Sequence, residues 1–339
     1  MERKNYKLKI LYLYKILYQY SDEEHPLSTK ELCEKLMEWG IEGERKSIYR
    51  DISVLKEFGA DIISTRIPKS GFFLARRRFE LPEVRLLLDA VLTAPFITNK
   101  KTTRLTGKLR ELLSCYQAED VWKQIYIDQR VKFTNEEIYY NIDAINRAIS
   151  ENKKISFQYY HKIIFNQTVV PDEGKEFIVS PYALLWSNDK YYLAGNYQKY
   201  DDIANFRLDR INKVVILEES ARSFSEVSPY PDYFDSADYL RKSFNMYNGE
   251  QALIELKCSN KILETILDKF GSDMEIGNCD SDSFTVRVRA CYSDGLIEWL
   301  LQYGDRIIVQ KPQTLRQEML QRIEQLNAAY RIMKEKHDR

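Results

Sequence analysis

The first sixty residues place apolar side chains at the spacing of amphipathic helices. This pattern predicts one helix over Lys7 to Tyr20 and a second over Thr29 to Trp39. The run Ser28-Thr-Lys-Glu31 has the form of a capping box, in which a serine hydroxyl and a glutamate side chain satisfy the first free amides of a helix. Gly40 then supplies the stop that ends the second helix.

A third helix is expected between Glu44 and Phe58, with Ile48, Ile52 and Leu55 as its buried stripe. Five residues occupy its outer face near the start: Arg45, Lys46, Ser47, Tyr49 and Arg50. A helix that presents such residues from its first turns suits the major groove of DNA, where base edges are read and phosphates are held. Asp51 is expected to pair with a nearby basic side chain of the protein and not to contact DNA.

Two short apolar runs, Ile62-Ile63 and Gly71 to Leu74, flank Pro68-Lys69-Ser70 and predict a two-stranded wing, which Arg76-Arg77-Arg78 follows. Residues 45–78 hold nine basic and three acidic residues, so positive charge is concentrated here. We therefore predict that residues 1–80 bind DNA. The alternative is a small helical domain whose cations are only solvated. The predicted DNA contacts are Arg45, Lys46, Ser47, Tyr49, Arg50, Lys69 and Arg76.

Residues 81–135 are interpreted as a helical connector. Pro82 suits the first turn of a helix that Pro95 closes. Its expected buried stripe is Val84, Leu87, Leu88, Val91 and Leu92. A further helix is expected over Thr98 to Tyr116, burying Leu105, Leu109, Leu112 and Leu113 and exposing Lys100, Lys101, Arg104, Lys108 and Arg110. These cations are a second DNA-backbone contact or, as the pattern favours, a solvated helix face. Residues 122–133 are ambiguous, and Asn135 to Asn152 predicts another helix.

Short strand patterns fill residues 136–222. They cover 154–159, 167–170, 175–179, 183–186, 190–195, 204–208 and 214–217, with turns at Asn188-Asp189 and Pro171 to Gly174. Many short strands at this spacing predict a small barrel or a strongly bent sheet.

The last third of the chain alternates strand and helix patterns. An ordered linker is expected over residues 223–248, followed by β-α-β-β-α-β and a final helix within 249–335. That order is typical of a ferredoxin-like sandwich. The final helix, Pro312 to Tyr330, is expected to bury Leu315, Met319, Ile323 and Leu326.

Composition narrows the class of protein. A chain of 339 residues predicts two or three domains. Lys+Arg and Asp+Glu are equal at 51 each, so any basic surface must be local. No apolar run is long enough to span a membrane, and no signal peptide is evident. Five scattered cysteines and three histidines argue against zinc or disulfides, so we expect a cytoplasmic protein without metal or cofactor.

The chain resembles three known families. Tyr191-Tyr192-Leu193 and the run FRLDRI at 206–211 look like the signature of the WYL domain, a sensor module of bacterial transcription factors, with Tyr191 where tryptophan is usual. The run SIYRDISVL at 47–55 resembles the recognition helix of the DeoR-like winged helix-turn-helix, and the last third resembles the WYL C-terminal extension. The resemblance implies a multidomain α+β protein: winged helix-turn-helix, helical connector, small Sm/SH3-like β-barrel and ferredoxin-like domain.

The candidate effector site lies in the barrel. Guanidinium groups among aromatic side chains suit an anion, since each offers a fixed fork of donors to phosphate or carboxylate. The candidates are Tyr159, His161, Ser180, Tyr182, Tyr192, Arg207 and Arg210. Two structural alternatives remain. Tyr192 is more typical of a core residue, and in a regular strand positions 207 and 210 face opposite sides unless a bulge intervenes.

Two functions follow from these patterns. The first is a sequence-specific transcriptional regulator that binds double-stranded DNA as a homodimer and responds to a nucleic-acid or nucleotide-like effector. The second is an accessory protein of a defence or stress system that binds single-stranded DNA or RNA. An enzyme is not expected, because the sequence holds no GxSxG, HExxH, P-loop or Rossmann glycine pattern.

Overall fold

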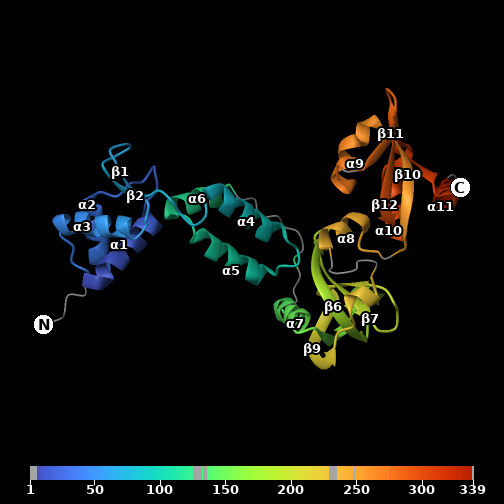
Figure 1. The fold of residues 1–339 in the computed structure, drawn as a ribbon, viewed down its shortest axis with the longest axis horizontal. Coiled ribbons are helices and arrows are strands. Elements are labelled where there is room, and N and C mark those ends of the chain that lie inside the picture. Colours follow the sequence, from blue (N-terminus) through green and yellow to red (C-terminus); the bar gives the residue numbers. More distant parts are fainter. Residues whose placement is uncertain are drawn as a thin grey trace. The chain divides into compact units, whose positions relative to one another are not determined.

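The computed structural model describes residues 6–124, 132, 136–228, 235–247, 249–272 and 274–337. The chain divides into two compact units, Met1–Thr134 and Asn135–Arg339, and each is described by itself (Figure 1). No helix among the described residues is long and apolar enough to cross a membrane.

The first unit begins with three helices and a β-hairpin. The elements are α1 (Tyr6–Tyr20), α2 (Thr29–Glu38), α3 (Arg45–Glu57), β1 (Ile62–Thr65) and β2 (Gly71–Leu74). All five were expected. The capping box of Ser28 and Glu31 is present at the start of α2. Gly71 is required where β2 pairs with Leu27, because a Cβ there would lie 2.7 Å from the Leu27 backbone.

The described residues of the connector form three helices: α4 (Leu81–Thr93), α5 (Asn99–Arg110) and α6 (Cys115–Lys123). The expectation of one helix over Thr98 to Tyr116 was wrong. The helix ends at Arg110, because the Ser114 side chain caps a new helix and forms a capping box with Gln117. The expected stripe was also partly wrong, because Leu87 is exposed on α4 and α5 buries Thr102 and Thr106. Of the ambiguous residues 122–133, residues 125–131 and 133 lie outside the described part.

A polar joint fastens the connector to the first three helices. The Arg77 guanidinium donates to the carbonyls of Tyr18 and Ser21, both at 2.6 Å, and the Tyr18 hydroxyl donates to the Leu112 carbonyl at 3.1 Å. The carboxylate of Asp22 is buried and accepts a 2.5 Å hydrogen bond from Ser114. The N-terminus of α6 is thereby tied to the end of α1.

The second unit opens with α7 (Ile138–Ser150) and seven strands. They are β3 (Lys153–Tyr159), β4 (Lys162–Phe165), β5 (Thr168–Pro171), β6 (Lys175–Ser187), β7 (Lys190–Tyr197), β8 (Ala204–Arg207) and β9 (Ile211–Ser220). Five of them form one antiparallel sheet in the order β8-β7-β6-β3-β9. The edge strands β8 and β9 are consecutive in the chain, joined only by a 3-10 helix over Leu208–Arg210, so the sheet curls to bring its edges together.

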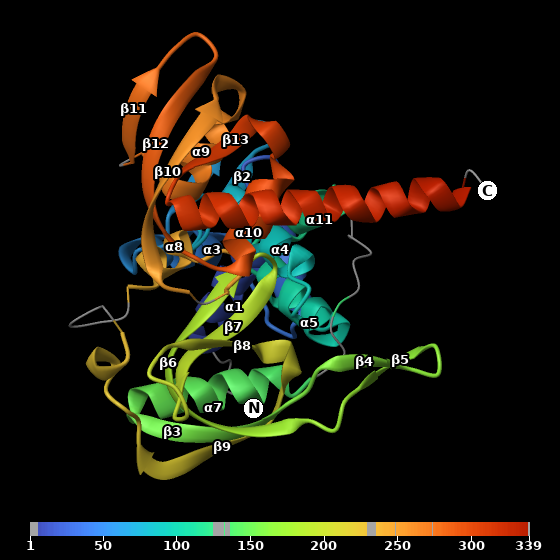
Figure 2. The same ribbon diagram turned by 90° about the vertical axis from the view of Figure 1, so that its right-hand side faces the viewer.

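Two details of this region differ from expectation. Residues 175–179 and 183–186 belong to one long strand, β6, with an irregularity between Pro181 and Ala183. Strand β4 was not expected; it pairs with β5 as a projecting two-stranded hairpin (Figure 2). Ile164 and Phe165 are exposed although they are apolar. The sequence therefore lacks the alternation of apolar and polar residues by which an exposed strand is recognised.

The remaining elements form the C-terminal region. After α8 (Ser236–Lys242), a helix in the expected linker, they are β10 (Gln251–Ser259), α9 (Leu263–Phe270), β11 (Glu275–Cys279), β12 (Ser283–Cys291), α10 (Asp294–Gln302), β13 (Ile307–Lys311) and α11 (Gln313–His337). The expected order β-α-β-β-α-β is present, with sheet order β11-β12-β10-β13. Helix α11 buries Leu315, but Ile323 and Leu326 are exposed, which contradicts the expected stripe. Linker residues 229–234 and 248 lie outside the described part.

Candidate nucleic-acid interface and effector site

The outer face of α3 carries the exposed candidates for DNA contact. The helix buries Ile48, Ile52 and Leu55, which places Lys46 and Arg50, four residues apart, on one outward face. Neither cation has an ion-pair partner among the described residues. Tyr49 lies beside them, 53% exposed, with its ring edge against Phe72 of the hairpin at 5.7 Å.

Behind this face, Lys9 of α1 holds α3 in place. Its ammonium lies 2.6 Å from the Asp51 carboxylate and donates to the Ser47 hydroxyl at 2.7 Å. The expectation that Asp51 pairs with a nearby basic side chain is therefore confirmed. Ser47 in turn donates its proton to the Glu44 carbonyl at 2.8 Å. In this arrangement Ser47 has no proton left for a phosphate, so its predicted DNA contact is not supported by the geometry.

Two other predicted contacts have partners within the unit. The Arg45 guanidinium donates to the Thr29 hydroxyl at 3.2 Å. The Lys69 ammonium lies 2.6 Å from the Glu31 carboxylate. Burial raises the pKa of Glu31, but hydrogen bonds from Lys69 and Ser28 outweigh it and lower that pKa to about 2. Both cations therefore stabilise the start of α2, and a phosphate would have to compete with Glu31 for Lys69.

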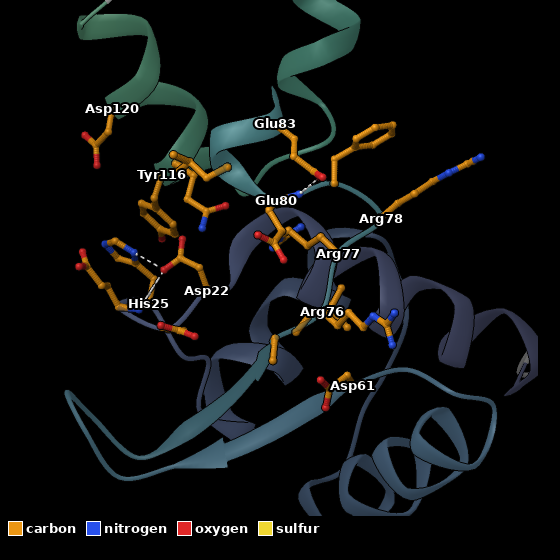
Figure 3. A pocket seen from close by; sticks show the side chains of 17 residues that line it. Asp22, His25, Asp61, Arg76, Arg77, Arg78, Glu80, Glu83, Tyr116 and Asp120 are labelled. Carbon is orange, nitrogen blue, oxygen red and sulfur yellow. Dashed lines mark hydrogen bonds and ion pairs between the residues drawn. The ribbon is translucent and has the colours of Figure 1, made fainter. Parts of the chain in front are cut away.

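The three consecutive arginines after the hairpin have different roles. Arg77 is held by carbonyl groups in the joint, whereas Arg76 and Arg78 are exposed. They border a cavity of about 810 Å³, where His25 stacks on Tyr116 at 3.8 Å beside Asp22 (Figure 3). Seven carboxylates line this cavity against three arginines, which does not suit a phosphate. Of these three arginines, Arg76 and Arg78 therefore remain candidates for contact with DNA.

Arg66 is a further candidate for DNA contact that was not among the residues predicted from the sequence. It lies between β1 and β2, at the tip of the hairpin, is exposed, and has no partner among the residues that the structure describes. Its position in the loop between the two apolar runs was the available signal.

In the second unit, five of the predicted effector residues lie close together. Tyr192 of β7 pairs in register with Arg207 of β8. The backbone amide of Arg207 donates to the Tyr159 hydroxyl at 3.2 Å, and the His161 ring packs edge-on against Tyr159 at 5.2 Å. Burial raises the pKa of Tyr192, while the nearby charges of Arg207 and Arg210 oppose that rise. The structure thus brings two tyrosines, a histidine and two arginines to one place.

The geometry of the FRLDRI run resolves how both arginines reach this place. Regular strand structure ends at Arg207, and Leu208–Arg210 is a 3-10 helix. Arg207 is the extended residue before this helix and Arg210 is its last residue, so regular strand alternation does not apply between them, and the charges of both act on Tyr192. The expectation of opposite faces applied only to a regular strand, which the chain does not form here.

The two arginines differ in their availability. Arg207 makes a two-pronged ion pair with Asp209, at 3.0 and 2.7 Å, which raises the pKa of Arg207. Arg210 is half-buried and has no ion-pair partner among the described residues. An incoming anion would therefore meet the free charge of Arg210 first and would compete with Asp209 for Arg207.

The hydroxyl groups of Ser180 and Tyr182 make their hydrogen bonds to another part of the chain, although the Tyr182 ring packs against the apolar group that includes Tyr192. The Tyr182 hydroxyl donates to the Arg222 carbonyl at 3.0 Å, and the Ser180 hydroxyl accepts from the Arg222 amide at 2.9 Å. Burial raises the pKa of Tyr182 to about 12. Both residues hold the chain just after β9, which is a structural role.

No sequence motif marked Arg222, whose side chain pairs with Asp201 at 2.7 Å. Within the described ranges, no group of three metal-ligating residues is found.

Comparisons with known proteins agree with part of this picture. The WYL domain family matches residues 140–216, and the WCX domain family matches residues 250–326. No curated protein matches the chain. Among solved structures, the proteasome accessory factor B/C (PafBC) of Arthrobacter aurescens is similar at 17% identity and a TM-score of 0.29, over 92% of this chain. The present chain spans only 47% of that protein. A CRISPR Cas-related protein is similar at 12% identity and a TM-score of 0.37, over 97% of this chain and 86% of the other.

Proposed function

We propose that this chain, a WYL-domain protein with a C-terminal WCX domain, is a transcriptional regulator that binds a specific duplex DNA site and responds to an anionic effector. The observation that carries the proposal is the construction of α3. Its apolar stripe is buried, its position is fixed by Lys9 and Asp51, and Lys46, Tyr49 and Arg50 face outward. A helix held in this way can present donors to base edges and phosphates in the major groove.

The same proposal assigns the regions. Three helices with a hairpin support a winged helix-turn-helix in residues 1–80, followed by a connector to residue 135. The curled sheet, whose edge strands are joined by a 3-10 helix, supports an Sm/SH3-like sensor domain in 136–222. The order β11-β12-β10-β13 supports a ferredoxin-like domain in 249–335. The WYL match over residues 140–216 supports a sensor role in addition to the proposed DNA-binding role.

The effector is proposed to be a nucleic acid or a nucleotide-like anion. Arg210 offers a free guanidinium, and Arg207 offers a second when Asp209 is displaced. Displacing Asp209 frees the 3-10 helix that joins the edge strands of the sensor sheet, so the effector has a physical means of favouring one conformation over another. Recognition of a symmetric operator would require a homodimer. The role proposed is regulatory and not catalytic.

The test is equilibrium binding to a duplex pool of random sequence at low salt, measured by fluorescence anisotropy. Wild type is compared with Lys46→Ala/Arg50→Ala. The control, Lys257→Ala/Lys261→Ala, removes the same charge from exposed lysines of the C-terminal region. Weaker binding in the α3 variant alone supports the proposal. Equal binding by all three proteins, or binding to single strands but not to duplex, contradicts it.

A further inference from the structure

Helix α5 carries an unusual concentration of positive charge. Five of its residues are basic and none is acidic: Lys100, Lys101, Arg104, Lys108 and Arg110. Lys100, Arg104 and Lys108 are exposed and have no ion-pair or hydrogen-bond partner in the described part of the chain. Because the chain as a whole has equal numbers of basic and acidic residues, this helix forms a local basic surface, which suits an anionic partner.

The three cations form a straight stripe that points directly into solvent. They are four residues apart, so they follow one another along the same face at about 6 Å intervals. The buried residues of α5 are Thr102 and Thr106, which lie on the opposite side of the helix. The stripe is thus the most outward part of the connector helix and is not a by-product of packing.

Gly107 gives this face a second unusual property. A Cβ at this position would meet nothing within 4 Å, so packing does not require glycine here. Glycine inside a helix costs about 1 kcal/mol relative to alanine. Because glycine has no side chain, the helix surface between Arg104 and Lys108 does not project there, and a chain of phosphates can approach the backbone closely. Glu111, at the end of the helix, is the one carboxylate that follows the stripe.

The chemistry of the stripe favours a nucleic-acid backbone over a protein. Protein interfaces are built around an apolar core, and this face presents cations and no large apolar side chain. Phosphate contacts, by contrast, are made largely by lysine and arginine.

The neighbouring groove argues for duplex and against a single strand. It is lined by Tyr18, Tyr20 and Trp39, among others. Each of these rings already carries a cation: Arg77 over Tyr18 at 4.8 Å, Lys35 over Tyr20 at 3.7 Å and Lys15 over Trp39 at 4.5 Å. Single-strand binding depends on aromatic faces that are open to stacking bases. On each of these rings a cation already covers one face, which reduces the surface that is open to a stacking base.

We propose that the Lys100–Arg104–Lys108 stripe of α5 is a second binding surface for duplex DNA, which holds phosphates without reading sequence. This inference rests on the proposed function, because it adds a backbone contact to the one made by α3. In this proposal α5 contributes to the affinity for duplex DNA and does not contribute to the choice of sequence.

The dependence of duplex affinity on salt measures this share directly. Each phosphate contact contributes about −0.9 to the slope of log K against log salt. In the variant Lys100→Gln/Arg104→Gln/Lys108→Gln this slope should be shallower by about 2.7. When salt is raised from 50 to 200 mM, the fall in duplex affinity should therefore be about 40-fold smaller for the variant than for wild type. The same change is expected with a selected site and with a random duplex.

Two control variants make the result specific. Lys257→Gln/Lys261→Gln/Arg289→Gln removes two lysines and one arginine from exposed positions of the C-terminal region and should keep the wild-type slope. Lys100→Arg/Lys108→Arg keeps the charge and should do the same. Equal thermal unfolding of all variants shows that α5 is intact.

The contrary outcomes separate the two proposals. If wild type binds duplex and the α5 variant keeps its slope, the α5 surface is refuted while the role of α3 stands. If the α5 variant loses binding to single strands only, the duplex assignment is refuted. If wild type binds no duplex, both proposals are overturned.

Discussion

The ammonium of Lys9 lies 2.6 Å from the carboxylate of Asp51, and the lysine side chain is only 7% exposed. This ion pair joins α1 to the middle of α3, the helix whose outer face we assign to DNA. The same ammonium donates to Ser47, one turn earlier. The orientation of α3 therefore depends on this ion pair as well as on the apolar stripe of the helix.

Removing one member of this pair is predicted to destabilise the first unit. Asp51→Ala leaves the Lys9 ammonium buried without its counter-charge, which should cost about 3 kcal/mol, the lower end of the range for broken buried pairs. Urea unfolding followed by fluorescence checks this value. The double variant Lys9→Met/Asp51→Leu should recover most of the stability, because no charge is then left unpaired. Equal stability of Asp51→Ala and wild type would show that the pair is not important.

Acid should weaken the unit partly through Glu31. Its pKa is about 2 in the folded chain, against an ordinary value of 4.5. Because the folded pKa is depressed, the stabilisation is fully present above pH 4.5 and is lost as the pH falls towards 2. Glu31→Gln should therefore flatten the fall in stability over this range and should be less stable than wild type at pH 7. Glu34→Gln, one turn further along α2, is the control. Parallel pH curves for wild type and Glu31→Gln would contradict the assignment.

The ion pair between Arg207 and Asp209 is predicted to limit binding of anions to the WYL domain. Asp209→Asn keeps the shape of the side chain but frees Arg207, so affinity for a single-stranded DNA oligonucleotide should rise about tenfold, or about 1.4 kcal/mol. Arg210→Ala should lower it by a similar factor. Calorimetric titration of the three proteins at constant salt measures both changes. Should Asp209→Asn bind no more tightly than wild type, Arg207 is not part of the site.

Local signals in the sequence predicted most of the elements. The capping box at Ser28 and the stripe Ile48, Ile52 and Leu55 are contained within a few residues, and both are present as expected. Ser114-Cys-Tyr-Gln117 has the same local form, so the break after α5 was also readable. It was missed because the leucines beyond Arg110 continue the helical spacing, and the stronger apolar signal hid the cap.

The parts of the site that escaped prediction depend on contacts distant in sequence. Nothing near Lys9 shows that it pairs with Asp51, and nothing near Tyr182 shows that its hydroxyl holds the carbonyl of Arg222. The 3-10 helix at Leu208–Arg210 is fixed by the need to join two edges of a curled sheet, which is a property of the whole domain. For the same reason, residue types identified the candidate cations, but only the fold separates those already paired, such as Lys69, from those without an ion-pair partner among the described residues, such as Arg50.

The central claim is that α3 reads a specific duplex site, and selection from a random duplex DNA library tests it most directly. Wild type and Arg50→Ala are selected in parallel, with Lys257→Ala as the matched control. We expect an enriched inverted repeat for wild type and for the control, and loss of base preference in Arg50→Ala, whose missing contact should cost about 1–3 kcal/mol. No enriched sequence for wild type, or the same enriched sequence for Arg50→Ala, would contradict the account.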